Sequence, residues 1–119
     1  AISLEPLAAA LRDARARGVR VRVLSDDEQA REAKSAVPHL VAEGVPVRTD
    51  RSVKFHLHHK FCLVDGGPLL AHGSFNWSRG AAHGNQENLI LSRCPRLASR
   101  FAAEFERLWL ALDPTPPPT

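Results

Sequence analysis

The stretch Phe55-His56-Leu57-His58-His59-Lys60-Phe61-Cys62-Leu63-Val64-Asp65 is the most informative part of this sequence. A strand is predicted over 55–64, because an apolar run fills its second half and the turn residues Asp65-Gly66-Gly67 follow. Alternate side chains on a strand share a face, so His58 and Lys60 should emerge side by side. A neutral imidazole can attack phosphorus, and an ammonium can hold a phosphate oxygen, so this pair suits phosphoryl chemistry.

Polar residues downstream supply the other groups that such chemistry needs. The turn Gly73-Ser74-Phe75-Asn76 carries a hydroxyl and an amide that can donate hydrogen bonds to a phosphate. Glu87 stands just before a short predicted strand, and its carboxylate can accept the Nδ1–H of a histidine. That contact would fix the tautomer that attacks through Nε2. Nucleophile, cation, neutral donors and orienting acid together form a metal-free set for phosphoryl transfer.

The rest of the sequence alternates helical and strand patterns. Helices are predicted from Leu4 to Gly18 with Ser3 as N-cap, after a cap at Ser35 as far as Gly44, and from Pro95 to Leu112. Strands are predicted at 19–24, 45–47, 55–64, 69–71 and 88–91, with the fourth returning antiparallel to the third. Residues 26–34 form either a loop or a short helix. This order predicts an α/β fold, a mixed β-sheet flanked by helices.

The length of 119 residues predicts one domain with one core. We place the domain at residues 1–113 and a Pro-rich, disordered tail at 114–119. The sequence opens directly on a helical pattern and contains no methionine, so we expect the domain to be N-terminally truncated in this chain. A formal net charge of +3 permits a polyanionic partner without requiring one.

Three segments together resemble one known family. HHKFCLVD at 58–65, GSFNWS at 73–78 and QEN at 86–88 look like the HxKxxxxD, GSxN and Glu signature of the phospholipase D superfamily. The likeness is greatest to its single-motif branch, which holds small bacterial endonucleases and the mitochondrial cardiolipin-hydrolysing, Zucchini-type enzymes. It covers about residues 2–114, and residues 26–34 match worst.

This resemblance implies a role for each residue of the motif. It makes His58 the nucleophile or, in the partner subunit, the general acid. It makes Lys60, Ser74 and Asn76 the ligands of the substrate phosphate, and Glu87 the carboxylate that orients His58. No cofactor is implied.

The third motif residue, Asp65, is expected to hold local geometry rather than to touch substrate. Seven residues separate Asp65 from Gly73, where the family usually has six. We place the extra residue in the turn at 66–68, because the tip of a hairpin absorbs insertions at little cost. A shift of the return strand would instead misplace Ser74 and Asn76.

The chemistry also predicts a second subunit. Displacing an alkoxide requires an acid on the far side of phosphorus, and one His58 cannot occupy both sides. Single-motif relatives form two-fold dimers, so the resemblance implies a homodimer with a shared active site. It further implies hydrolysis through a phosphohistidine, acting on cardiolipin or on single-stranded RNA or DNA. A link to piRNA production, the mitochondrial outer membrane and an upstream membrane anchor are implied in the same way.

Two other interpretations stay open. One is a metal site, although Lys60 would repel a cation. The histidines near the motif that could bind a metal are His56, His58, His59, His72 and His83. Alternatively, the domain binds nucleic acid or phospholipid without cleaving it. Basic residues would then line a groove, and two aromatic rings would stack on bases or meet lipid: Arg48, Arg51, Lys54 and Arg79, with Phe75 and Trp77.

Overall fold

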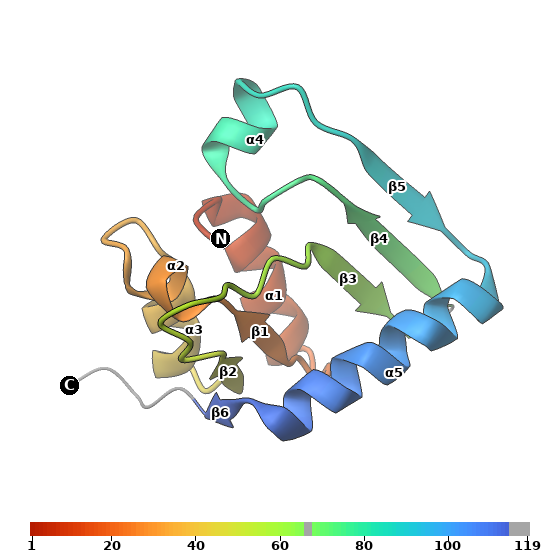
Figure 1. Ribbon diagram of the computed structural model, residues 1–119, viewed down its shortest axis with the longest axis horizontal. Coiled ribbons are helices and arrows are strands. Elements are labelled where there is room, and N and C mark those ends of the chain that lie inside the picture. The colour runs from red at the N-terminus through yellow and green to blue at the C-terminus, as the bar shows by residue number, and fades with distance from the viewer. Residues whose placement is uncertain (66–67, 115–119) are drawn as a thin grey trace.

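The computed structural model describes residues 1–65 and 68–114. Helices and strands alternate along the chain, which confirms the predicted α/β class (Figure 1). Their order is α1 (Glu5–Ala16), β1 (Val23–Ser25), α2 (Asp27–Arg31), α3 (Val37–Ala42), β2 (Val47–Thr49), β3 (Phe61–Val64), β4 (Leu69–Gly73), α4 (Arg79–His83), β5 (Leu89–Ser92), α5 (Pro95–Ala111) and β6 (Asp113–Pro114). Within the described ranges, no helix is both long and apolar enough to cross a bilayer.

The described strands form two three-stranded sheets. In the first sheet, of order β1-β2-β6, β1 and β2 run parallel and β6 pairs antiparallel to β2. The second sheet, β3-β4-β5, is an antiparallel meander in which each strand pairs with its neighbour in sequence. In Figure 1, α5 runs past one end of this meander, and α4 lies beyond the opposite end.

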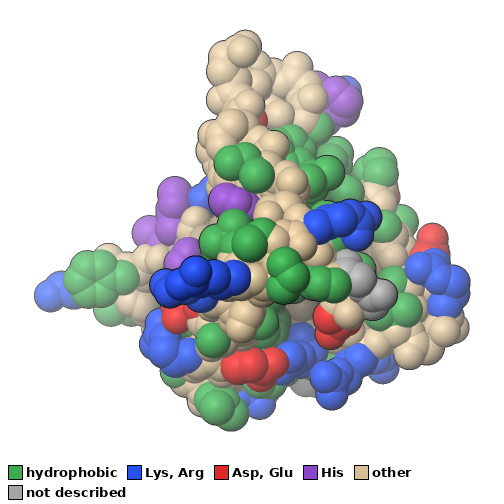
Figure 2. Space-filling model, turned by 90° about the vertical axis from the view of Figure 1, so that its right-hand side faces the viewer, with side chains coloured by type: hydrophobic (Ala, Val, Ile, Leu, Met, Phe, Trp, Pro, Cys, Tyr) green, Lys and Arg blue, Asp and Glu red, His purple; other side chains and the backbone are tan. Residues whose placement is uncertain are grey.

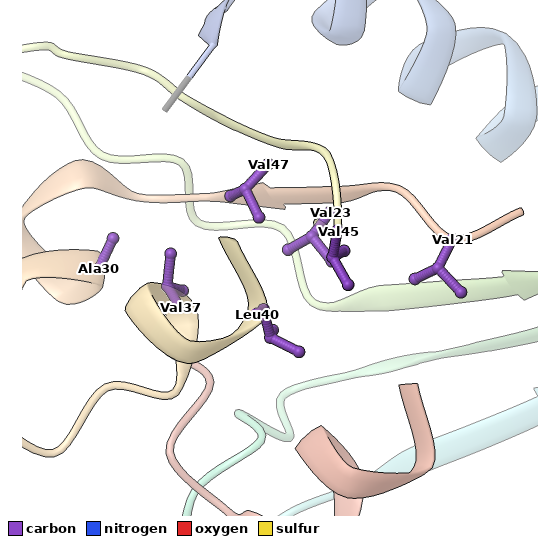
Figure 3. Packing of buried hydrophobic residues seen from close by; sticks show 7 residues of the cluster. All are labelled: Val21, Val23, Ala30, Val37, Leu40, Val45 and Val47. Carbon is purple, nitrogen blue, oxygen red and sulfur yellow. The ribbon is translucent and has the colours of Figure 1, made fainter. Parts of the chain in front are cut away.

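A valine-rich cluster forms the core around the first sheet. Valines in and beside β1 and β2 pack against apolar residues of α2 and α3. The buried residues of this cluster, shown in Figure 3, are Val21, Val23, Ala30, Val37, Leu40, Val45 and Val47. A parallel sheet needs burial on both faces, which explains β-branched residues in this segment. The meander is tied to α5 through Phe61, whose ring lies 5.0 Å from that of Phe101 and 6.3 Å from that of Phe105.

Two predicted strands are shorter than expected. The strand predicted at 19–24 is paired only from Val23, and the strand predicted at 55–64 begins at Phe61. In the second case, side chains use the backbone donors that a ladder would need. The N–H of Leu57 donates to Asp50 Oδ2 at 2.8 Å, and the N–H of Phe55 donates to Ser52 Oγ at 2.9 Å. Such local bonds compete directly with strand pairing.

Helix starts also differ from the predictions. The N-cap of α1 is Leu4 without a side-chain cap, because the Ser3 backbone N–H pairs with Trp77 O at 2.7 Å and Pro6 sets the first turn. α3 begins at Val37, two residues after Ser35, whose hydroxyl accepts from the Val37 N–H at 3.2 Å.

Residues 26–34 contain the short helix α2, whose N-cap Asp26 accepts from the Gln29 N–H at 2.9 Å. The N-terminal end of the predicted tail is paired, because Asp113–Pro114 forms β6. The predicted turn at 66–67 and the tail at 115–119 lie outside the described residues.

Candidate active site

His58 and Lys60 lie together at the entrance to β3. The Nζ of Lys60 is 3.1 Å from Nδ1 of His58 and donates to the His58 carbonyl at 2.7 Å. His58 is exposed, and Lys60 is half-buried. The predicted juxtaposition of the two side chains is therefore present, although His58 and Lys60 precede the strand rather than belong to it.

Ser74 and Glu87 meet beside this pair. The Ser74 hydroxyl donates to Oε2 of Glu87 and accepts from the Asn88 N–H at 3.1 Å. Asn85 donates from Nδ2 to Oε1 of Glu87 at 3.1 Å. These hydrogen bonds from Ser74 and then Asn85, with the nearby charge of Lys60, outweigh the effect of burial and lower the pKa of Glu87. Glu87 is thus held as a carboxylate close to the ammonium.

The hydrogen-bond partners of Glu87 differ from its predicted partner. Its two oxygens are engaged by Ser74 and Asn85, whereas the ring of His58 contacts Lys60. The orienting contact between Glu87 and His58 stays a prediction. Sequence reasoning missed Asn85, whose position two residues before Glu87 was the available signal.

Gly73 permits the close approach that positions Ser74. Its N–H donates to Lys60 O at 3.4 Å, so Gly73 lies opposite Lys60. A Cβ at this position would overlap the backbone oxygen of Asn88 and stand 3.0 Å from the carbonyl carbon of that residue. Only glycine allows the end of β4 and the start of β5 to come this near.

The extra residue before Gly73 leaves the β3–β4 ladder in register. Val64 pairs with Leu69 and Phe61 with His72. Ser74 still meets Glu87 beside Lys60. The predicted location of the extra residue, at 66–68, includes residues 66–67, which lie outside the described part of the chain.

The contacts of Asn76 and Asp65 are with residues other than His58 and Lys60. Asn76 Oδ1 accepts from the backbone nitrogen of Ala1 at 3.1 Å. Asp65 follows the far end of β3, where its charge acts on Arg22. The guanidinium of Arg22 forms an ion pair with Glu106 and lies 5.1 Å from the ring centroid of Trp109. The phosphate-binding role of Asn76 and the geometric role of Asp65 stay predictions.

The basic groove predicted around the motif lacks Arg48. Its guanidinium lies 4.5 Å from the ring centroid of Trp109 and donates to the backbone oxygens of Trp109 and Leu112. Arg48 therefore holds the C-terminal end of α5. Arg51 donates to Pro114 O at 3.3 Å, whereas Lys54 and Arg79 are exposed.

An acidic cluster lies at the base of the segment before His58. Asp50 accepts from the N–H groups of Asp27, at 3.0 Å, and Leu57, at 2.8 Å. Asp26 Oδ2 lies 2.8 Å from Nδ1 of His56. Burial raises the pKa of Asp26, but the hydrogen bonds from the Gln29 N–H and His56 outweigh it and lower that pKa overall. The hydrogen bond between Asp26 and His56 in turn raises the pKa of His56.

This cluster also brings together oxygen atoms of the kind that bind metal ions. Within 1–65 and 68–114, the group of acidic or histidine ligand atoms that lie within 4.8 Å of one another comprises Asp26, Asp27 and Asp50. Asp27 Oδ1 is buried without a hydrogen-bond partner. Most of the other oxygens already accept hydrogen bonds, so the cluster serves first as the anchor of the segment 50–57. The predicted histidine metal site differs from it, because His56 contacts Asp26 and His58 contacts Lys60.

Two solved structures have the same fold as this chain. The crystal structure of Nuc from Salmonella typhimurium, a phospholipase D family member, superposes with a TM-score of 0.84 at 29% identity. The superposition covers 97% of this chain and 76% of the Nuc chain. NucT from Helicobacter pylori shares the fold with a TM-score of 0.83 at 15% identity. The class is therefore that of phospholipase D-type α/β domains.

The sequence comparisons agree with the structural ones. The family model "Cardiolipin synthase, PLD-like domain" matches residues 1–109. The chain belongs to this phospholipase D-like family.

Curated relatives carry the name mitochondrial cardiolipin hydrolase. The Danio rerio protein is 43% identical over 98 residues, which is 82% of this chain and 43% of that protein. The Chlamydomonas reinhardtii protein is 42% identical over 93 residues, 78% of this chain and 41% of its own length. The Homo sapiens protein is 37% identical over 99 residues, which is 83% of this chain and 38% of that protein. The chain thus spans less than half the length of these relatives.

Proposed function

We propose that this chain is the catalytic core of a metal-independent phosphodiesterase that works through a phosphohistidine on His58. One observation carries the proposal: the His58–Lys60 contact and the Ser74–Glu87 hydrogen bond lie at the same end of the β3–β4–β5 meander. A nucleophile, a cation, a hydroxyl donor and a carboxylate are thereby gathered around a space open to solvent.

Phosphate binding would switch His58 into its attacking form. The Nζ of Lys60 lies 3.1 Å from Nδ1 of His58, and because an ammonium can only donate, this contact would favour the tautomer with the ring proton on Nε2. Attack through Nε2 requires the opposite tautomer. A substrate phosphate competes for Lys60 and draws the ammonium onto a non-bridging oxygen. Nδ1 then carries the proton and donates it to a carboxylate, for which Glu87 is the candidate.

The reaction proceeds in two displacements. The lone pair on His58 Nε2 forms a P–N bond as the P–O bond to the leaving alkoxide breaks, and an acid protonates that alkoxide. A water molecule then attacks phosphorus and loses its proton to the same group, and the P–N bond breaks to release a phosphate monoester.

That acid must approach from the side opposite to His58. The partner subunit's His58 meets the requirement in a two-fold dimer, since an isologous contact brings identical residues together at the axis. We therefore propose a homodimer with one shared active site.

Cardiolipin is the proposed substrate, with phosphatidic acid as product. The support comes from the relatives named mitochondrial cardiolipin hydrolase. By the same likeness we propose a place at the mitochondrial outer membrane, reached through an anchor upstream of this chain. Cleavage of single-stranded RNA in piRNA production would use the same chemistry, since both substrates are phosphodiesters.

The test is to trap the intermediate. Protein is mixed with ³²P-labelled diester, quenched within milliseconds and analysed for acid-labile, base-stable phosphohistidine. His58→Ala should carry no label and lose at least about 1000-fold in turnover. His59→Ala, which alters the neighbouring histidine, should still carry the label and turn over at the wild-type rate. EDTA should leave turnover unchanged.

Three results would count against this assignment. Turnover by His58→Ala would remove the nucleophile. Loss of activity in EDTA that added metal restores would favour a metal mechanism. Tight binding of the diester without any turnover by the wild type would favour the non-catalytic binding module.

A further inference from the structure

Two large apolar side chains stand in solvent immediately before the motif. Val53 is 99% exposed and Phe55 is 74% exposed, in a segment that we call the tip loop (residues 51–56). Leaving such side chains in water forgoes the stabilisation that burial would give. Phe55 precedes His58 by three residues, so its Cα lies within about 11 Å of that of the proposed nucleophile.

Hydrogen bonds hold the tip loop in this shape. Asp50 accepts from the Leu57 N–H and so closes its base, while His56 is fixed to buried Asp26. Within the loop, Ser52 Oγ accepts from the N–H groups of Lys54 and Phe55, at 3.3 and 2.9 Å. Arg51 has a φ of +46°, a conformation rare for a residue with a side chain. The loop is thus built to project its apolar residues.

Cationic groups accompany the apolar pair. Lys54 is exposed between Val53 and Phe55, and half-buried Lys60 lies nearby along the chain. Figure 2 shows green apolar and blue basic side chains together on a projection of the surface, with histidine side chains beside it. Acidic groups of the neighbourhood lie at the base, where Asp26 and Glu28 face His56. An apolar tip with a positive flank is complementary to an anionic phospholipid surface.

We propose that the tip loop is an interfacial anchor that inserts Val53 and Phe55 into an anionic bilayer. Insertion would place His58 and Lys60 at the depth of the lipid phosphates. This inference rests on the proposed function for its catalytic consequence, because only a diester-cleaving site gains from that placement. The insertion itself is a property of the loop alone.

Vesicle flotation tests the anchor. The full chain is mixed with phosphatidylcholine vesicles with or without 20% cardiolipin, and bound protein is measured across salt concentrations. Removing each apolar side chain should weaken partitioning about tenfold, so V53S/F55S should bind far less than wild type. K54A should lose about fivefold on cardiolipin vesicles and little on pure phosphatidylcholine. L110S, at an 81% exposed leucine of α5, is the matched control and should bind normally.

Hydrolysis separates the anchor from the active site. V53S/F55S should cleave the soluble diester bis(p-nitrophenyl) phosphate at the wild-type rate and cardiolipin in vesicles much more slowly. Wild-type vesicle binding by V53S/F55S would overturn the anchor. So would a changed oligomeric state in sedimentation, or weakened binding of a labelled single-stranded oligonucleotide with vesicle binding intact. If wild type binds vesicles through the loop but cleaves no diester, the proposed function fails and the anchor stands.

Discussion

Lys60 contacts His58 in the structure, and the proposed mechanism gives it a second partner, the substrate phosphate. Without substrate, its ammonium contacts the ring and carbonyl of His58, which would favour Nδ1 as an acceptor. Glu87 is meanwhile held by Ser74 and Asn85. These hydrogen bonds favour the ionised form of Glu87. Under the proposed mechanism, a bound phosphate would draw Lys60 away and free Nδ1 of His58 to carry the proton.

Glu87→Gln should reduce kcat about 10- to 100-fold with little change in KM, because the amide cannot accept the Nδ1 proton as a carboxylate does. Steady-state kinetics on a soluble diester measure both constants. Equal effects on kcat and KM would argue for a phosphate-binding role instead.

The pH profile supplies a control for that role. Asn85 helps to lower the pKa of Glu87, so Glu87 stays ionised at more acidic pH. Asn85→Ala should raise that pKa and move the acidic limb of the kcat profile to higher pH. An unchanged limb would mean that ionisation of Glu87 does not limit turnover.

At the scale of elements, the meander β3–β4–β5 assembles the site through one tight crossing. Gly73→Ala should force the β4 and β5 backbones apart, since the new Cβ would meet Asn88 O. We expect a loss of about 2–4 kcal/mol in the free energy of unfolding, and reduced turnover as Ser74 moves from Glu87.

Gly80→Ala is the matched control for this crossing. Gly80 lies in α4, and an added methyl group would meet nothing within 4 Å, so alanine should be neutral or stabilising by up to about 1 kcal/mol. Denaturant unfolding of both variants provides the comparison. Similar stability of the two would show that the crossing tolerates a side chain.

Sequence patterns predicted the elements better than their ends. The β3–β4 hairpin, the final helix and the closure of α3 at Gly44, with its φ of +83°, were predictable from apolar spacing and turn residues. The strand at β5 was predicted as well, but not its pairing with β4. The late start of β3 was not, because it depends on the Asp50 side chain capturing the Leu57 N–H, seven residues along the chain. Likewise, Arg48 looked like a free cation until α5 brought Trp109 over it.

The site was predictable to the same degree. Residue types, spacing and the family resemblance selected His58, Lys60, Ser74 and Glu87, which the structure brings near one another. The same reasoning selected Asn76 and Asp65, whose roles stay predictions. The three-dimensional partners, above all Asn85 with Glu87 and Asp26 with His56, follow from loop paths that carry no periodic signal.

At the scale of the whole molecule, the proposed shared active site would make the two subunits depend on each other. If each site needs two copies of His58, a mixed dimer of wild type and His58→Ala is inactive. With subunit exchange, a tenfold excess of His58→Ala should reduce activity per wild-type subunit to about one tenth. The same excess of His59→Ala should not. Unchanged activity in both mixtures would mean that each subunit works alone.

The pairing of β6 with β2 has a consequence for how the molecule opens. Thr49 pairs with Asp113 across 64 positions, whereas Val64 pairs with Leu69 across 5. Closing the longer loop costs on the order of 2 kcal/mol more in chain entropy. Among the described residues, the β2–β6 ladder has two residue pairs, and hydrogen bonds from Arg48 and Arg51 to the backbone of 109–114 add to them. The pairing of β6 therefore costs more chain entropy than the pairing within the meander, whose contacts are local in sequence, and fraying is expected to begin at β6.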